Sequence, residues 1–311
     1  MINCHGVVHV RGTPASGKTT LARHLAQRLK NTHRVVFIES WGITPLSTTA
    51  YLVSRAHGAG YLDVTEDEFF GHRHNNLVFI IDEAQVTYVD SLLWYTAIKT
   101  RIGIVSGPGF CLFSSYGSPS TGAPSFNYPA TTTPPILRKE QRVSLTIPAG
   151  SQMPTISLFY TTSEFEDVIV RFCRQPSVEF TLAEDLQNHL YSLTDGHPGV
   201  VHAVLTFIQS VYRTRFKRTE IRRLTLDHIR GDLDDDEKLI EYVKLAPAGR
   251  GFPSRDLLQQ SADPKIIAVF LDILYNGSRK PRGEYKDELK RARSDSQDGQ
   301  DDQNEQGDPD D

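Results

Sequence analysis

The sequence G-V-V-H-V-R-G-T-P-A-S-G-K-T-T occupies residues 6–20 and joins an apolar run to a loop bracketed by glycines. Val7–Val10 is short and mostly apolar, which is typical of a buried parallel strand. Residues 21–29 follow directly, with apolar side chains at helical spacing. A strand, a G-x-x-x-x-G-K-T loop and a helix in this order predict a loop that binds phosphate groups.

Each position of this loop has an expected role. Gly12 and Gly17 permit backbone angles and a close approach that a Cβ would block. The N–H groups from about Ala15 onward point at a triphosphate, and the helix N-terminus adds partial positive charge. Lys18 reaches the β- and γ-phosphates, and the Thr19 hydroxyl is a ligand for Mg²⁺. The residues expected to contact nucleotide are Gly12, Thr13, Pro14, Ala15, Ser16, Gly17, Lys18, Thr19 and Thr20.

A second signal is the apolar run Leu77–Ile81, which leads directly into Asp82 and Glu83. At the carboxyl end of a strand, Asp82 is expected to hold Mg²⁺, and Glu83 to polarise an attacking water as the catalytic base beside Lys18. The alternative is that Asp82 only caps a helix. The phosphate loop about 60 residues upstream favours the catalytic interpretation.

The next buried strand is expected from Gly109 and ends in the small polar residues Ser114 and Ser115. In nucleotide hydrolases with a catalytic glutamate, a polar residue at this place often contacts the γ-phosphate, so both serines are candidates for nucleotide contact. The alternative is that the two serines only mark the transition from the strand to a loop, since residues 118–135 are rich in Ser, Thr and Pro.

Composition and charge limit the class of protein. The chain has 311 residues, a hydrophobic content of 39% and a formal charge of −4. Residues 294–311, here called the acidic tail, hold eight acidic side chains and no basic one, so −4 less −8 leaves about +4 for the rest. No apolar run approaches the roughly 20 residues that span a bilayer, and no signal peptide is recognisable. Cys4, Cys111 and Cys173 are scattered, which predicts free thiols in an intracellular protein, cytoplasmic or nuclear.

Hydrophobic periodicity gives the remaining elements. We expect strands at 34–39, 141–147 and 158–160, and helices at 90–100, 163–173, 182–191, about 199–212, 239–245 and 263–275. Residues 46–70 are expected to be largely helical, with a capping box at Thr65 and Glu68. From Gly277 onward, few apolar residues remain and disorder is expected. The predicted division is 1–160, a nucleotide-binding core, 161–276, a helical region, and 277–311, a disordered acidic segment.

Four features together resemble the STAND and AAA+ branch of P-loop ATPases: Gly12–Thr19, Leu77–Glu83, the pair Ser114-Ser115 and the turn Gly196–Gly199. The resemblance implies an α/β fold, a parallel sheet sandwiched by helices and followed by a helical lid and a winged-helix-like region. It also implies that Pro198 packs against the nucleotide base. The stretches R-G-T-P-A-S-G-K-T-T-L-A, F-I-I-D-E-A-Q and Y-G-S are similar to the ATPase modules of fungal Crinkler-type proteins. Two features depart from these families, because neither an effector domain nor a second sensor arginine is identifiable.

The sequence therefore predicts a protein that binds ATP and Mg²⁺, hydrolyses ATP slowly and acts as a nucleotide-dependent switch. One alternative is a nucleotide-dependent adaptor that binds DNA or protein through residues 200–275, where Lys217–Arg223 is a basic stretch or merely a solvated helix face. A small-molecule kinase is another, although residues 118–135 offer no arginine for a phosphate-closing lid. A GTPase is disfavoured because no Asn/Thr-Lys-x-Asp motif is present.

Overall fold

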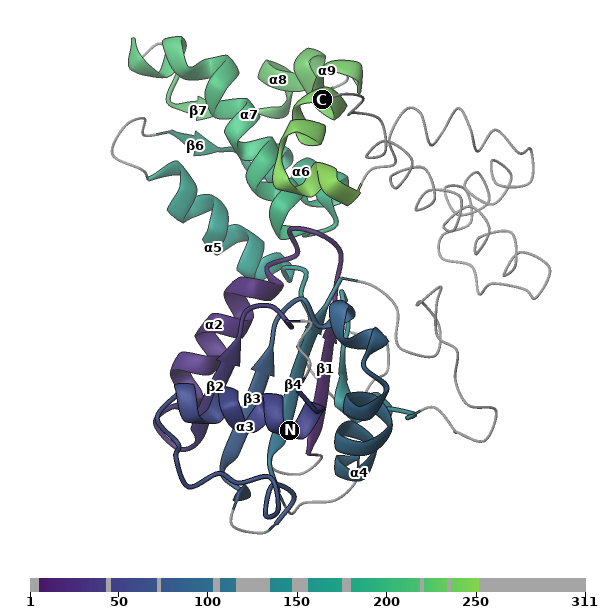
Figure 1. Ribbon diagram of the computed structural model, residues 1–311. Helices are drawn as coiled ribbons and strands as arrows, with labels where there is room; N and C mark the ends of the chain where they lie inside the picture. Colours follow the sequence, from purple (N-terminus) through teal and green to yellow (C-terminus); the bar gives the residue numbers. More distant parts are fainter. Residues whose placement is uncertain are drawn as a thin grey trace, which may run out of the picture. The chain divides into compact units, whose positions relative to one another are not determined.

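The computed structural model describes the chain in segments (Figure 1). These are residues 6–42, 46–71, 74–102, 107–115, 135–146, 156–174, 180–218, 221–233 and 236–251. They all belong to one compact unit, Met1–Gly251, and the second unit, Phe252–Asp311, lies outside the described residues. The predicted helix at 263–275, the acidic tail, most of the loop 118–135 and part of the winged-helix-like region therefore also lie outside them.

Five parallel strands form the central sheet in the order β2-β3-β4-β1-β5 (Figure 1). They are β1 (Val7–Arg11), β2 (Arg34–Ile38), β3 (Leu77–Ile81), β4 (Gly109–Ser114) and β5 (Arg142–Val143). The strand predicted at 141–147 is only two residues long. The strand predicted at 158–160 is wrong, because Leu158 and Phe159 lie in irregular backbone whose N–H groups bond to Leu145 O. An α/β fold with a parallel sheet is thus confirmed.

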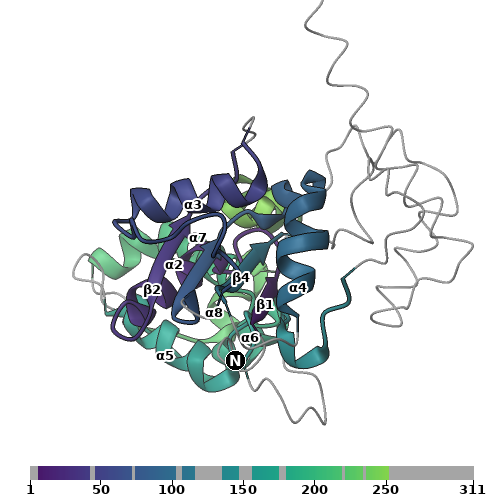
Figure 2. The ribbon, with the colours of Figure 1, turned by 60° about the horizontal axis from the view of Figure 1, so that its bottom comes forward.

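Helices cover both faces of the sheet (Figure 2). On one face, α2 (Lys18–Leu29) buries Ala22 and Ala26 against alternate residues of β1, β3 and β4. On the other face lie α3 (Thr48–Gly58), the 3₁₀ helix η2 (Ala84–Val89), the π-helical turn η3 (Leu93–Ile98) and α4 (Lys99–Arg101). The strands are almost wholly buried because both faces are covered, which explains their continuous apolar sequences.

The helix predicted at residues 65–70 is wrong, because these residues form turns. Phe69 is fully buried and its ring lies 5.7 Å from that of Phe79 on β3. A helix in this region begins instead after Ser47, whose hydroxyl accepts a hydrogen bond from Ala50 N at 3.1 Å. Burial of an aromatic ring against the sheet therefore overrides the local capping signal at Thr65.

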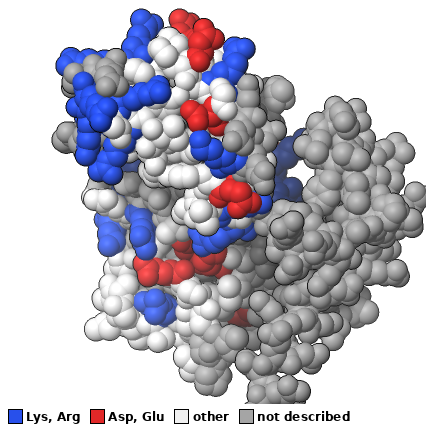
Figure 3. Space-filling view, turned by 90° about the horizontal axis from the view of Figure 1, so that it is seen from above, with Lys and Arg blue, Asp and Glu red and all other residues white. Residues whose placement is uncertain are grey.

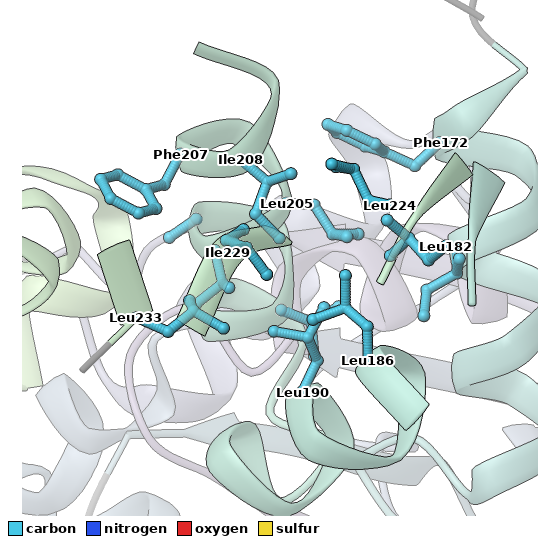
Figure 4. Packing of buried hydrophobic residues seen from close by; sticks show 14 of the residues in the cluster. Phe172, Leu182, Leu186, Leu190, Leu205, Phe207, Ile208, Leu224, Ile229 and Leu233 are labelled. Atoms are coloured by element: carbon cyan, nitrogen blue, oxygen red, sulfur yellow. The ribbon is translucent and has the colours of Figure 1, made fainter. Parts of the chain in front are cut away.

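Residues 161–251, here called the helical part, have their own hydrophobic core (Figure 4). The elements are α5 (Thr162–Cys173), β6 (Thr181–Leu182), α6 (Glu184–Thr194), α7 (Pro198–Lys217), β7 (Arg223–Leu224), α8 (Leu226–Leu233), α9 (Asp236–Leu245) and the 3₁₀ helix η5 (Pro247–Gly251). The helix α7 runs past its predicted end near Tyr212, because Tyr212 and Phe216 are buried one turn apart. None of the described helices is long and apolar enough to cross a membrane.

The thiols of Cys111 and Cys173 are free and buried, whereas Cys4 lies outside the described residues. Burial raises the pKa of each of these two thiols to about 12, so they stay protonated at neutral pH.

His9 occupies the middle of β1 and is 1% exposed. Its Nε2 lies 2.7 Å from Ser114 Oγ on the neighbouring strand β4. Burial, and then the positive charges of Arg11 and Arg142, lower the pKa of His9 from 6.5 to about 3. Because the unfolded chain binds this proton at a higher pH than the folded chain, the folded state loses stability as the pH falls below 6.5.

We predict that the free energy of unfolding falls by about 1.4 kcal/mol per pH unit below pH 6.5 on account of His9 alone, or about 2 kcal/mol at pH 5. Urea denaturation of the wild-type chain and of His9→Gln at pH 5 and pH 7 measures this loss. The variant is expected to lose less stability on acidification, and His24→Gln, at an exposed site on α2, to behave as wild type. The same dependence on pH in all three proteins would contradict the assignment.

Candidate functional site

A pocket of about 350 Å³ lies where the chain leaves the carboxyl ends of β1, β3 and β4. From β1 the chain passes to α2 on one face of the sheet, and from β3 it passes to η2 on the other face. Diverging connections of this kind leave a crevice at the strand ends, where ligands of open α/β sheets bind. The pocket is lined by Pro14, Ala15, Gly17, Lys18, Thr19, Thr20, Glu83, Ser115 and Arg250.

The loop after β1, Gly12–Gly17, has a backbone that few residues adopt. Gly17 has φ 86° and Ala15 has φ 59°, both in the left-handed region. At Gly12, a Cβ would lie 2.3 Å from Leu158 Cδ1 and 2.5 Å from Ser16 Oγ, so a larger residue would force these two side chains to move. Alternation of left-handed and right-handed residues turns successive N–H groups toward one side, and concavities of this kind bind anions in many proteins. Gly12 thus allows close packing, and Gly17 adopts a backbone angle that favours glycine.

Lys18 begins α2 and its side chain folds back over the loop. Its Nζ donates hydrogen bonds to Gly12 O at 3.0 Å and to Thr13 O at 2.9 Å. Burial lowers the pKa of Lys18, and the carboxylates of Glu83 and Asp82 oppose that shift. No ion pair joins Lys18 to an acidic side chain in the part of the chain that the structure describes. The ammonium group is therefore partly desolvated and, among the described residues, bonds only to neutral carbonyls, a state that an anion in the pocket would stabilise.

Glu83 faces the pocket from the end of β3 and belongs to a short chain of hydrogen bonds. The side-chain amide of Gln85 donates to Glu83 Oε2, and Gln85 Oε1 accepts a bond from Ser115 N at 3.1 Å. Glu83 itself has φ 48°, and its N–H donates to Asp82 Oδ1 at 3.0 Å. Gln85, which the sequence did not single out, thus fixes the carboxylate relative to the end of β4.

The two candidate serines have different surroundings. Ser115 lines the pocket. Ser114 is fully buried, its hydroxyl contacts His9 and its carbonyl accepts Gly12 N at 3.1 Å. Ser114 therefore ties β1 to β4 beneath the loop instead of facing the pocket.

The remaining predicted residues lie outside the pocket lining: Gly12, Thr13, Ser16, Asp82 and Pro198. Asp82 is 4% exposed, directly before Glu83. Ser16 Oγ is buried and has no hydrogen-bond partner among the described residues. Pro198 is the first residue of α7 and is partly buried, and its neighbour Gly199 meets the loop.

Arg250 is a pocket residue that the sequence analysis missed. It lies in η5, the last described element, and joins Lys18 and Glu83 in the lining. The turn that carries it approaches the loop, because a Cβ on Gly251 would lie 3.8 Å from Pro14 Cδ. Its positive charge also contributes to lowering the pKa of Lys18. The sequence P-A-G-R-G is typical of a loop. No local pattern indicates that its arginine lies near residues some 230 positions earlier in the chain.

The N-terminus of α7 is fastened to the loop. His197 caps the helix, its Nδ1 accepting from Val200 N at 3.3 Å, so its proton lies on Nε2 and is donated to Thr13 Oγ1 at 2.9 Å. A Cβ on Gly199 would lie 2.5 Å from Ala15 Cβ, so the helix start packs directly on the loop. Burial lowers the pKa of His197, which favours the neutral ring that this arrangement needs.

No protein-family model matches this sequence, and the search of curated proteins found no match. The function must therefore be inferred from the residues of the site.

The residues of the pocket and its surroundings have the charges and oxygens that suit a nucleoside triphosphate with Mg²⁺. Two cationic side chains of the lining, Lys18 and Arg250, suit the phosphates, and Thr19 carries an oxygen of the kind that Mg²⁺ prefers. Asp82, directly before Glu83 but outside the lining, also carries such oxygens. Among the described residues, no group of three His, Cys, Asp or Glu side chains gathers into a metal site of its own. A magnesium ion held by one or two protein oxygens and by substrate phosphates requires no such group.

We predict that Gly199→Ala lowers the free energy of unfolding by about 1–3 kcal/mol, because the new methyl group overlaps Ala15. Urea denaturation measures the change. Gly231→Ala is the matched control: Gly231 lies within α8 with open space around its Cβ position, so alanine there is expected to be neutral or stabilising by up to about 1 kcal/mol. Equal effects at the two glycines would show that α7 does not pack closely on the loop.

Proposed function

We propose that this chain binds ATP with Mg²⁺ in the pocket after β1 and hydrolyses it slowly, as a nucleotide-dependent switch. The observation that carries the proposal is the position of Lys18, a partly desolvated ammonium group that bonds to loop carbonyls and lines a pocket together with Glu83 and Arg250. The preference for adenine depends on the resemblance in sequence and on the missing guanine motif. The fold supports the proposal, because parallel sheets bind ligands at this edge.

The expected contacts follow from the geometry of the loop. The N–H groups of the left-handed turn and the start of α2 face the phosphates. Lys18 exchanges its bonds to Gly12 O and Thr13 O for bonds to phosphate oxygens, and Arg250 adds a second positive charge. Thr19 and Asp82 would hold Mg²⁺, which would supply positive charge beside the phosphates.

In the hydrolytic step, Glu83 accepts a proton from a water molecule that attacks the γ-phosphorus, and the bond between this phosphorus and the β,γ-bridging oxygen breaks to leave ADP and phosphate. Gln85 positions the carboxylate through its amide. Because phosphoryl transfer asks little covalent chemistry of the protein, catalysis comes mainly from position and charge.

The switch resides in the contact between the loop and α7. Lys18 bonds to Thr13 O, and the hydroxyl of the same threonine accepts from His197. A phosphate that draws Lys18 away from this carbonyl changes the environment of the residue that holds the cap of α7. Nucleotide occupancy is thereby expected to alter the helical part, which is the property of a switch.

We predict that MgATP stabilises the wild-type chain and that Lys18→Met abolishes this effect, because methionine keeps the apolar stem but removes the charge. At a ligand concentration 100 times Kd, binding adds about 2.7 kcal/mol, which is a rise in Tm of several degrees for a domain of this size. Thermal unfolding with and without MgATP measures the shift, with GTP as the test of base preference. Lys30→Met, at the exposed end of α2, is the control. An undiminished shift in Lys18→Met would place nucleotide elsewhere.

We predict that Glu83→Gln keeps the MgATP-induced rise in Tm but lowers kcat by about 10²–10⁴-fold, because an amide cannot accept the proton. Gln85→Ala should reduce kcat more mildly, since the carboxylate remains but is no longer held. Phosphate release under saturating ATP measures both. Normal turnover in Glu83→Gln would assign the base to another group, while retained binding would leave the nucleotide site intact.

A further inference from the structure

We propose that the end of the helical part where α5, α7 and β7 converge binds the phosphate backbone of duplex nucleic acid. The surface, here called the basic end, consists of Arg174, Arg213, Lys217, Arg222 and Arg223, all of them exposed. In the view onto the helical part from above, Lys and Arg side chains gather along one side (Figure 3). This inference is independent of whether the pocket hydrolyses ATP.

Phe180 brings the three elements together. Its ring stacks on Phe216 of α7 at 4.4 Å, and its N–H donates to Cys173 O at the end of α5 at 3.3 Å. The following residue, Thr181 in β6, donates from its N–H to Arg222 O beside β7 at 2.8 Å. Arg174, Lys217 and Arg222 each adjoin one of these contacts in sequence. Packing around one buried phenylalanine therefore gathers cations from stretches about 40 residues apart.

Among the described residues, no acidic side chain forms an ion pair with the cations of the basic end. Elsewhere in the helical part such pairs are present, as in Arg171–Asp167 and Lys238–Asp232. Residues 210–230 contain seven Arg and Lys and two acidic residues, which gives a formal charge of +5.

Stability alone does not explain this arrangement. A cation near a helix C-terminus interacts favourably with the helix dipole, and a charged residue on an edge strand discourages pairing with other chains. One cation at the end of each helix, or on the edge strand, is enough for these effects. Gathering all of them at one place adds like-charge repulsion, which disfavours the folded state. A polyanionic partner removes that repulsion and accounts for the convergence.

The chemistry of the basic end favours phosphate. Four of its five residues are arginines, whose planar fork matches phosphate oxygens and which predominate in nucleic-acid recognition. Duplex DNA presents one negative charge per about 1.7 Å of helix axis, a regular array that several separate cations can contact at once. The carboxylates of an acidic protein offer no such regular spacing.

The aromatic residues of this region favour a duplex over a single strand. Proteins that bind single strands stack bases on exposed aromatic rings. Here the rings beside the basic end, those of Phe172, Phe180, Tyr212 and Phe216, are all buried. The neighbouring stretches 175–179 and 219–220 contain no aromatic residue in the sequence. Contact with the outer phosphates of a duplex needs no stacking surface.

The basic end is also separate from the nucleotide pocket. The N-terminus of α7 packs on Ala15 of the loop, whereas Lys217 is its last residue. Twenty helical residues span about 30 Å. A phosphate backbone at the basic end therefore does not occupy the place of the nucleotide phosphates.

The experiment measures binding of a fluorescein-labelled 20-base-pair DNA duplex by anisotropy between 50 and 200 mM salt. Two full-length proteins are used: the natural chain, and a chain whose eight acidic residues in 294–311 are replaced by Asn or Gln, so that the acidic tail cannot compete. We expect micromolar binding at 50 mM salt by the second protein, with log K falling against log salt with a slope of about −3 to −5.

The triple variant Arg174→Gln, Lys217→Gln and Arg223→Gln removes one cation from each converging element. In the neutral-tail chain it is expected to weaken binding at 50 mM salt at least tenfold and to reduce the salt slope by about 2–3. The matched control, Arg28→Gln, Lys30→Gln and Arg55→Gln, removes the same charge from exposed positions in and beside α2 and α3 and should bind as the parent protein does. Circular dichroism and Tm establish that both variants are folded.

Several results would overturn the proposal. They are failure of the neutral-tail chain to bind the duplex at 50 mM salt, or an equal loss in the control variant. Tighter binding of a single strand with the same number of phosphates would indicate base stacking. Equal or tighter binding of polyglutamate would indicate an acidic protein partner.

Discussion

The insertion of β4 between β1 and β3 sets the dimensions of the pocket. Arg11 pairs with Ser114, and the bond from Gly12 N to Ser114 O carries that ladder one residue into the loop. On the other side, β3 pairs with β4 up to Ile81 and Leu112. Neighbouring strands lie about 4.8 Å apart, so the loop and Glu83 face each other across about 10 Å. An interval of this width is large enough for a phosphate group and a water molecule, and the end of β4 lies between the loop and Glu83.

Backbone strain is concentrated in the same region. Among the described residues, Ala15, Glu83 and Asp195 are the non-glycine residues with positive φ. Ala15 and Glu83 line the pocket, and Asp195 begins the turn that leads through Gly196 to His197. Such conformations cost on the order of 1–3 kcal/mol each and persist where surrounding contacts fix them. Here the fixing contacts are the close packing of Gly199 on Ala15 and the bond from Glu83 N to Asp82.

The sequence predicted those parts of the site that are local in the chain. The glycines at fixed spacing and the apolar run before Asp82 and Glu83 are patterns of a few consecutive residues. In the structure, residues of the loop, Glu83 and Ser115 line one pocket. The prediction at Thr65 was wrong because burial of Phe69 competes with a capping pattern worth about 1 kcal/mol. The sequence could not place Arg250 in the site, because its position follows from the packing of distant elements. It could not place Gln85 either, because the role of Gln85 is a side-chain amide that bonds to groups at the ends of two strands.

The helix α7 extends from the proposed nucleotide pocket to the basic end. The carbonyl of Thr13 accepts a hydrogen bond from Lys18, and its hydroxyl contacts His197. Thr13 therefore connects Lys18 to the residue that caps the start of α7. At the far end of α7, Phe216 stacks on Phe180, and the packing around Phe180 brings the cations of the basic end together. Because packed interiors change between discrete arrangements instead of deforming smoothly, a shift of the loop moves α7 as a whole or not at all. Gly199 lies at the junction of the two, where the absence of a Cβ lets the start of α7 pack directly on Ala15 of the loop.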